Sequence, residues 1–116
     1  MTVRVANILP FIVLKSFAFQ DRHENKDAYD LIFTLLHFSR GPHDAGAAAV
    51  RSPVAGHRQV VEALSLLKER FQDVEQDGPV AYAVFLAASG DKNNLARLRR
   101  EAVATVSQFL RAYEAR

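Results

Sequence analysis

Five charged side chains of the kinds that hold phosphates and position substrates gather within one short segment of the sequence. They are Lys15, Arg22, Lys26, Asp27 and Asp30. Lys15 interrupts an otherwise apolar run, and an ammonium group is costly to bury unless a carboxylate or an anionic ligand lies beside it. Residues 15–30 are therefore the segment in which we expect any chemistry of this chain.

The two cations of the first part of this segment have a spacing that suits a phosphate. Lys15, Ala18 and Arg22 share one helical face if the helix extends as far as Arg22. The small side chain of Ala18 leaves a gap between the two cations. An anion would fit this gap.

The next helix adds the remaining candidates. Lys26 and Asp30 are four residues apart, and Asp27 lies between them, near a helix N-terminus that itself attracts anions. The three cations are thus candidates for binding a nucleoside triphosphate. The two aspartates are candidates for positioning a base, a hydroxyl group or a water molecule.

The same residues also have a purely structural interpretation. Lys15 can extend toward solvent and pair with Asp27 or Asp30, while Asp27 caps the helix that follows. Spacing alone favours this interpretation, because ion pairs are more often structural than functional. Both interpretations remain open at this point.

Two stretches of the segment resemble motifs of a known enzyme family. Residues 15–22, KSFAFQDR, resemble the K-x-x-A-x-x-x-R motif of the AbiEii-like nucleotidyltransferases, a group that includes toxin enzymes of type IV toxin–antitoxin pairs. Residues 25–31, NKDAYDL, resemble the R-x-K-D and D-x-x-D elements that follow, and the match in order and spacing covers residues 3–40. The resemblance implies that the nucleotide side of an active-site cleft is lined by Lys15, Arg22, Lys26, Asp27 and Asp30.

The sequence departs from that family at two places. Glu24 stands where the family usually has an arginine, and the family's first motif, a Gly-Ser turn followed by an Asp-x-Asp pair, does not occur in these 116 residues. Two-metal phosphoryl transfer needs those carboxylates to hold Mg²⁺. The resemblance therefore implies a C-terminal helical lobe that is inactive alone, and it implies a Mg-nucleoside triphosphate only where the missing catalytic lobe is supplied as a partner.

The elements that position these residues are expected to be helices. The alternation of Val3, Val5 and Ile8 permits a short strand before Pro10. Beyond it, apolar spacing and turn residues predict helices over about residues 10–20, 27–39, 42–50, 57–71, 79–86 and 94–113. The first of these is apolar on almost all sides, so we expect it in the middle of the domain.

Two of the predicted helices carry apolar stripes at helical spacing, which indicates that they face a core. The stripes are Val60, Leu64, Leu67 and Phe71, and Leu95, Leu98, Ala102, Val106, Phe109 and Tyr113. The sequence thus predicts an all-α fold of five or six helices in one bundle-like domain over residues 1–116.

Composition narrows the classes of function. Hydrophobic residues make up 49% of the chain, as in an ordered domain, and the formal net charge of +2 is too small to predict specific nucleic-acid binding. No apolar stretch approaches the roughly 20 residues of a membrane span, and there is no cysteine, so we expect a cytoplasmic protein. No metal site is predicted either, because zinc-ligand spacing is absent among His23, His37, His43 and His57.

A non-enzymatic helical module is the alternative function. In that case the apolar face left by the absent lobe would pack on a partner protein or on a second copy of the chain, giving a homo-oligomer. Stabilisation by a Mg-nucleotide would separate the two functions, because only a binding lobe gains stability from it.

Overall fold

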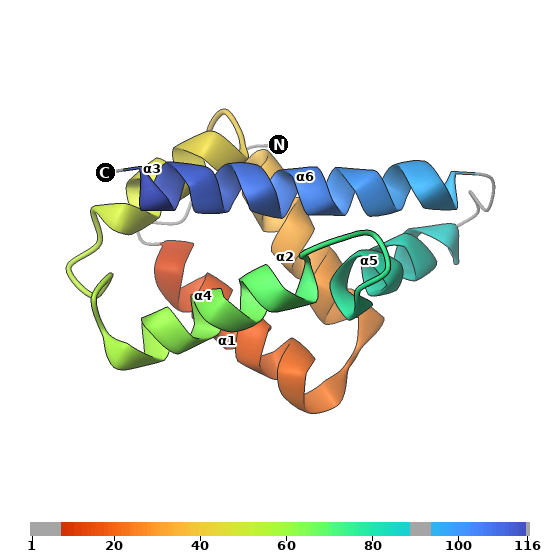
Figure 1. The fold of residues 1–116 in the computed structure, drawn as a ribbon, viewed down its shortest axis with the longest axis horizontal. Coiled ribbons are helices and arrows are strands. Elements are labelled where there is room, and N and C mark those ends of the chain that lie inside the picture. Colours follow the sequence, from red (N-terminus) through yellow and green to blue (C-terminus); the bar gives the residue numbers. More distant parts are fainter. Residues whose placement is uncertain (1–7, 89–93, 116) are drawn as a thin grey trace.

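The computed structural model describes residues 8–88 and 94–115, which form six helices and no strand (Figure 1). The helices are α1 (Ile8–Arg22), α2 (Asn25–His37), α3 (Pro42–Val50), α4 (Arg58–Arg70), α5 (Asp77–Ala87) and α6 (Leu95–Glu114). The radius of gyration of the Cα atoms is 13.2 Å, as expected for a compact chain of this length. The predicted all-α fold is confirmed, and each predicted helix is present with ends that shift by at most two residues.

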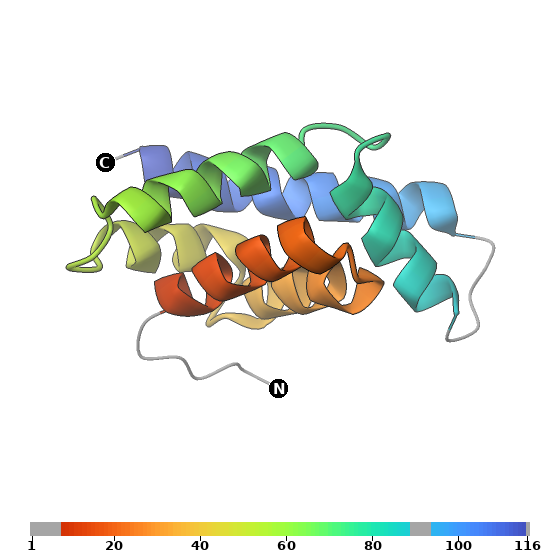
Figure 2. The same ribbon diagram turned by 90° about the horizontal axis from the view of Figure 1, so that it is seen from below.

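The longest helix, α6, organises the domain. It runs the length of the molecule (Figures 1 and 2). The C-terminal end of α6 packs along α3, and the N-terminal end of α6 packs along α5. The predicted stripe of α6 is buried at Leu98, Ala102, Val106 and Phe109. The two ends of that stripe, Leu95 and Tyr113, are only partly buried and pack against the core. The stripe of α4 is buried along its whole predicted length, so both stripes face the core as predicted.

The contact between α3 and α6 depends on a glycine. A Cβ atom added at Gly46 would lie 2.3 Å from the backbone oxygen of Phe109 and 2.7 Å from the Cβ atom of Ala112. Only a residue without a side chain allows the two helix backbones to approach this closely. The alanine-rich sequence of α3 serves the same contact, because its other core-facing residues are also small.

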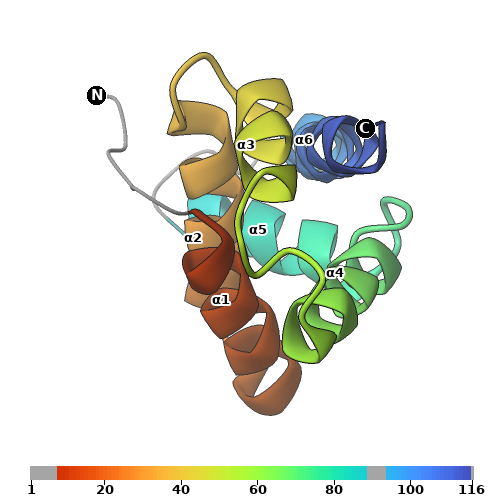
Figure 3. The same ribbon diagram turned by 90° about the vertical axis from the view of Figure 1, so that its left-hand side faces the viewer.

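The position of α1 differs from the expectation that it lies in the middle of the domain. It packs against α2 and α4 at one edge of the molecule, as the end-on view shows (Figure 3), and the side chain of Leu14 on its remaining face is 64% exposed. An apolar surface on all sides of a helix shows that burial is favourable, but the neighbours of α1, which also include α3 through a smaller contact, leave one of its faces uncovered. The expectation was wrong for this reason.

Two predicted boundaries of the first helices also change. Ile8 begins α1 and is buried, so its assignment to a strand was wrong, whereas Val3 and Val5 lie outside the described residues. Pro10 is the third residue of α1, inside the first turn, where its missing N–H costs no hydrogen bond. The second change concerns the C-terminal end of α2. This helix ends at His37 because the backbone of Phe38 is extended and Ser39 has a positive φ of 48°.

Candidate functional site

A connection of only two residues places the candidate residues of α1 and α2 side by side. His23 has a positive φ of 53°, which turns the chain, and its N–H donates to the backbone oxygen of Phe19 at 2.9 Å. The C-terminal end of α1 and the N-terminal end of α2 are therefore adjacent. Because α1 reaches Arg22, the condition for Lys15 and Arg22 to share one helical face is met.

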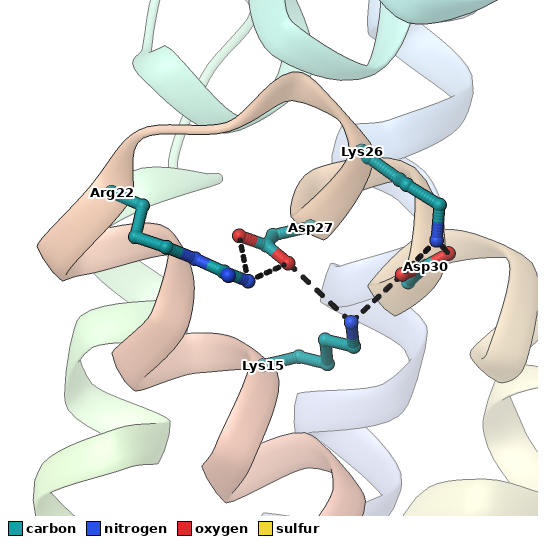
Figure 4. Close-up of polar contacts among 5 residues, drawn as sticks. All are labelled: Lys15, Arg22, Lys26, Asp27 and Asp30. Atoms are coloured by element: carbon teal, nitrogen blue, oxygen red, sulfur yellow. Dashed lines mark hydrogen bonds and ion pairs between the residues drawn. The ribbon is translucent and has the colours of Figure 1, made fainter.

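All five candidate residues meet in one ion cluster, which consists of Lys15, Arg22, Lys26, Asp27 and Asp30 (Figure 4). The Nζ atom of Lys15 lies 2.8 Å from Oδ2 of Asp30 and 3.4 Å from Oδ1 of Asp27. Lys15 thus bridges two carboxylates of the neighbouring helix. The predicted pairing of Lys15 with these aspartates is confirmed, and it involves both of them at once.

The other two cations bind the same carboxylates from opposite sides. The Nη2 atom of Arg22 donates to both carboxylate oxygens of Asp27, at 2.9 and 3.0 Å, and the Nζ atom of Lys26 lies 3.1 Å from Oδ2 of Asp30. Three cations therefore surround two carboxylates. The ion cluster has a formal charge of +1 if all five groups are ionised.

The predicted capping role of Asp27 was wrong. The residue before the first turn of α2 is Glu24, which makes no capping hydrogen bond through its side chain, and Asp27 lies inside that turn with its backbone N–H donating to the oxygen of Glu24. The helix starts earlier than expected because the connection from α1 is so short. The carboxylate of Asp27 extends instead toward Lys15 and Arg22, where its charge still favours the helix N-terminus.

The ion cluster has a buried base and an exposed rim. The side chain of Asp27 is only 3% exposed and that of Lys15 is 20% exposed, whereas Arg22 and Lys26 are 59% and 65% exposed. Ion pairs are screened less as they become less exposed, so the base contributes most to the cohesion of α1 and α2. The rim is the part that a ligand in solution can reach.

The charges of the ion cluster reinforce one another. The hydrogen bond to Asp30 raises the pKa of Lys15 above its ordinary value, and this effect exceeds the opposing effect of burial. Burial alone would raise the pKa of Asp30, but hydrogen bonds from Lys15 and Lys26 outweigh it, and the pKa is lowered. Both groups are therefore ionised over the whole neutral range.

The geometry limits which candidate residues can contact a ligand. Lys15 is held between two carboxylates, so it has a structural part whether or not an anion binds. Arg22 contacts Asp27 through one terminal nitrogen, and its Nε and Nη1 atoms have no partner in the described part of the chain. Arg22 and Lys26 are thus the residues best placed to receive phosphate oxygens.

A set of aromatic rings beside the ion cluster was missed by the sequence analysis. The ring of Tyr29 lies 4.8 Å from that of Phe85 on α5 and 5.6 Å from that of Phe33, measured between centroids. All three residues are only partly buried. The spacing of Lys26, Tyr29 and Phe33 at three and four residues was visible in the sequence and places them on one face of α2.

An apolar groove between α1 and α4 is a second surface feature. It has a volume of about 450 Å³ and is lined chiefly by Pro10, Val13, Leu14, Phe17 and Val54. The exposed face of α1 was unexpected because that helix was predicted to be central. Val54 lies in the connection before α4, where no periodic pattern could have indicated a contribution to the groove.

Comparisons with known proteins identify no relative of this chain. A scan against models of protein families finds no match, and neither a search of curated proteins nor a search of solved structures finds a similar protein. Within residues 8–88 and 94–115, no helix is long and apolar enough to cross a membrane, and no three side chains of His, Asp or Glu gather where they could hold a metal ion. Any function must therefore be argued from the site.

Proposed function

We propose that the chain is a nucleotide-binding or phosphate-binding helical lobe of the nucleotidyltransferase type, which depends on a second lobe for catalysis. The observation that carries this proposal is the convergence of the five residues of the two motifs on one ion cluster, with a formal positive charge and an exposed rim. Residues 12 positions apart in the sequence meet there. Because charges of opposite sign on adjacent helices also pair for structural reasons, the support for the proposal comes from the excess positive charge and the exposed rim rather than from the pairing itself.

The exposed rim supplies two complementary kinds of phosphate ligand. The guanidinium group of Arg22 can donate single hydrogen bonds to phosphate oxygens from Nε or Nη1, because Asp27 occupies the Nη2 atom that both paired edges share, while the ammonium group of Lys26 acts as a compact charge. Lys26 lies in the first turn of α2, so the positive end of the helix dipole adds to the attraction of an anion there. Lys15 acts through the aspartates, because it holds Asp27 and Asp30 and so fixes the positions of the two rim cations.

Catalysis by this lobe alone is not part of the proposal. Two-metal phosphoryl transfer needs carboxylates that are available to bind Mg²⁺, and both Asp27 and Asp30 are occupied by cations of the chain itself. A partner lobe that carries an Asp-x-Asp pair would bring the metal ions with it. The AbiEii-like motifs of residues 15–31 support this assignment of nucleotide binding to one lobe and metal binding to another. The same motifs imply a relationship to the enzymes of toxin–antitoxin pairs.

Thermal unfolding in the presence of ligands tests the proposal. Mg-ATP, Mg-GTP, Mg-CTP, Mg-UTP and Mg-tripolyphosphate would each be added to the 116-residue chain at increasing concentration. A ligand at 100 times its Kd stabilises the folded state by about 2.7 kcal/mol, which corresponds to a rise in Tm of roughly 10 °C for a domain of this size. No rise in Tm with any of these ligands would rule out the binding lobe.

A matched pair of variants locates the binding site. Lys26→Gln should lose most of the ligand-induced stabilisation, because it removes a rim cation. Lys68→Gln is the control, since Lys68 lies at the C-terminal end of α4, its side chain is 66% exposed, and it also contacts one carboxylate. Equal losses in the two variants would indicate nonspecific attraction of the anion to a positive surface.

A second candidate function is a helical interaction module, and the groove between α1 and α4 favours it. An exposed leucine beside a groove lined by apolar side chains is typical of a protein contact surface. If the occupant is a second copy of the chain, the sedimentation coefficient should rise with concentration, and Leu14→Gln should abolish the rise. A chain that stays monomeric at high concentration would contradict self-association.

A further inference from the structure

The aromatic rings near the ion cluster form a continuous surface across two helices, which we define as the aromatic surface of Tyr29, Phe33 and Phe85. The planes of the neighbouring rings are inclined by 30° and 34° to that of Tyr29. Both pairs are tilted, which is a favourable arrangement for aromatic side chains. The ring of His37 lies 4.4 Å from that of Phe33 between centroids and borders the aromatic surface at this end. The three side chains are partly buried rather than enclosed.

Tyr29 is fixed from behind by the core. Its ring stacks on that of Tyr82 with centroids 6.4 Å apart and an inclination of 13°, and the hydroxyl group of Tyr82 donates a hydrogen bond to Glu101 of α6. Tyr82 itself is buried. The outer part of the aromatic surface is therefore supported by a rigid layer, so a ligand that stacks on it need not order it first.

The aromatic surface continues the rim of the ion cluster along α2. Lys26, Tyr29 and Phe33 follow one another at spacings of three and four residues, which keeps them on one face of the helix. With a rise of about 1.5 Å per residue, Phe33 lies roughly 10 Å along the helix axis from Lys26. A cationic end and an aromatic end thus share one strip of surface.

We propose that this strip binds a nucleoside triphosphate in one orientation, with its phosphates at the rim of the ion cluster and its base stacked on the aromatic surface. The inference rests on the proposed function and extends it by assigning the base to Tyr29, Phe33 and Phe85. Every nucleobase has a π face, and stacking on an aromatic side chain requires no hydrogen-bond pattern. A polar, charged rim next to stacked rings matches a ligand that is anionic at one end and aromatic at the other.

Isothermal titration calorimetry with two probes tests the assignment. Mg-ATP and Mg-tripolyphosphate share a chain of three phosphates, but only the first has a nucleoside, and its chain has one ionisable oxygen fewer. The expected result is that Mg-ATP binds at least about fivefold more tightly than Mg-tripolyphosphate, which is the lower end of what stacking on one aromatic side chain supplies. Phe33→Leu and Phe85→Leu should each reduce this ratio while leaving the affinity for Mg-tripolyphosphate unchanged.

Phe17→Leu provides the matched control, because Phe17 is also partly buried but lines the groove between α1 and α4. It should leave the ratio unchanged. If both probes bind with equal affinity, the phosphate site stands and the base-stacking assignment is overturned. If neither probe binds, the proposed function fails and this inference fails with it. A ratio that falls equally in Phe17→Leu would also overturn the assignment, since the effect would then be a general consequence of lost packing.

Discussion

Replacing Lys15 by methionine separates the structural contribution of the ion cluster from any ligand. The substitution keeps an unbranched side chain of similar length but removes the charge, so two carboxylates lose a shared partner at 2.8 and 3.4 Å. Removing one member of a fully buried ion pair costs roughly 3–5 kcal/mol. Because Lys15 is 20% exposed and both aspartates retain another cation, we expect a smaller loss of about 2 kcal/mol.

The loss in Lys15→Met should depend on pH in a defined way. The pKa of Lys15 is raised above 10.5 in the folded state, so its contribution is complete below pH 10.5 and disappears as the pH rises through the raised value. The pKa of Asp30 is lowered below 3.8, so its contribution is complete above pH 3.8 and disappears as the pH falls through the lowered value. The difference between the variant and the parent should therefore be constant from about pH 5 to 9 and shrink on both sides.

Urea unfolding followed by circular dichroism of the helices measures this difference. With a slope of roughly 1–3 kcal/mol per molar urea for a small protein, a loss of about 2 kcal/mol lowers the midpoint by about 1 M. Lys26→Met is the control, because that exposed pair along one helix should contribute no more than about 0.5 kcal/mol. A loss below about 0.5 kcal/mol for Lys15→Met at neutral pH would refute the assignment of Lys15 as the centre of the ion cluster.

Three further predictions concern the helix contacts that support the site. Gly46→Ala should lower Tm by roughly 10 °C or more in a thermal melt, because the added methyl group would meet the backbone oxygen of Phe109, which cannot move independently of α6. Leu67→Ala removes a fully buried side chain and should cost about 2–5 kcal/mol in urea unfolding. Tyr82→Phe should cost about 1 kcal/mol, because it removes the hydrogen bond to Glu101.

Tyr82→Phe should also change how the free energy of unfolding depends on pH in alkaline solution. Burial, followed by the hydrogen bond to Glu101, raises the pKa of Tyr82 far above its ordinary value of 10.0. The folded state therefore retains the phenolic proton at a pH where the unfolded state releases it, and stability falls as the pH rises above 10. Tyr82→Phe should flatten that decline in unfolding experiments between pH 9 and about 11. An unchanged slope would contradict the role given to this phenol.

Periodicity predicted the helices well because each of them has a face that the core must cover. The stripes of α4 and α6 are regular enough to identify their core residues from spacing alone. The neighbours of a helix are a different matter. The apolar residues of α1 indicate burial on all sides, but its neighbours α2, α4 and, to a smaller extent, α3 leave one face uncovered, and this outcome depends on how the whole bundle is arranged.

The composition of the candidate site was predictable, while its internal pairing was not. Residue types and spacing selected all five members of the ion cluster. Which carboxylate binds which cation depends on the angle between α1 and α2 and on the turn at His23. Histidine is enriched at positive φ, but too weakly for the residue type to predict the turn. The capping role assigned to Asp27 was wrong because this turn starts α2 two residues earlier than expected.

The pairing of α3 with α6 also bears on how the chain folds as it is synthesised. α3 is complete at Val50, but the helix that covers it ends at Glu114. At roughly 5–20 residues per second, a ribosome needs about 3–13 seconds to add the intervening residues. Throughout that time the small-residue face around Gly46 lacks its contact with α6, so this part of the core can close only after α6 has been synthesised.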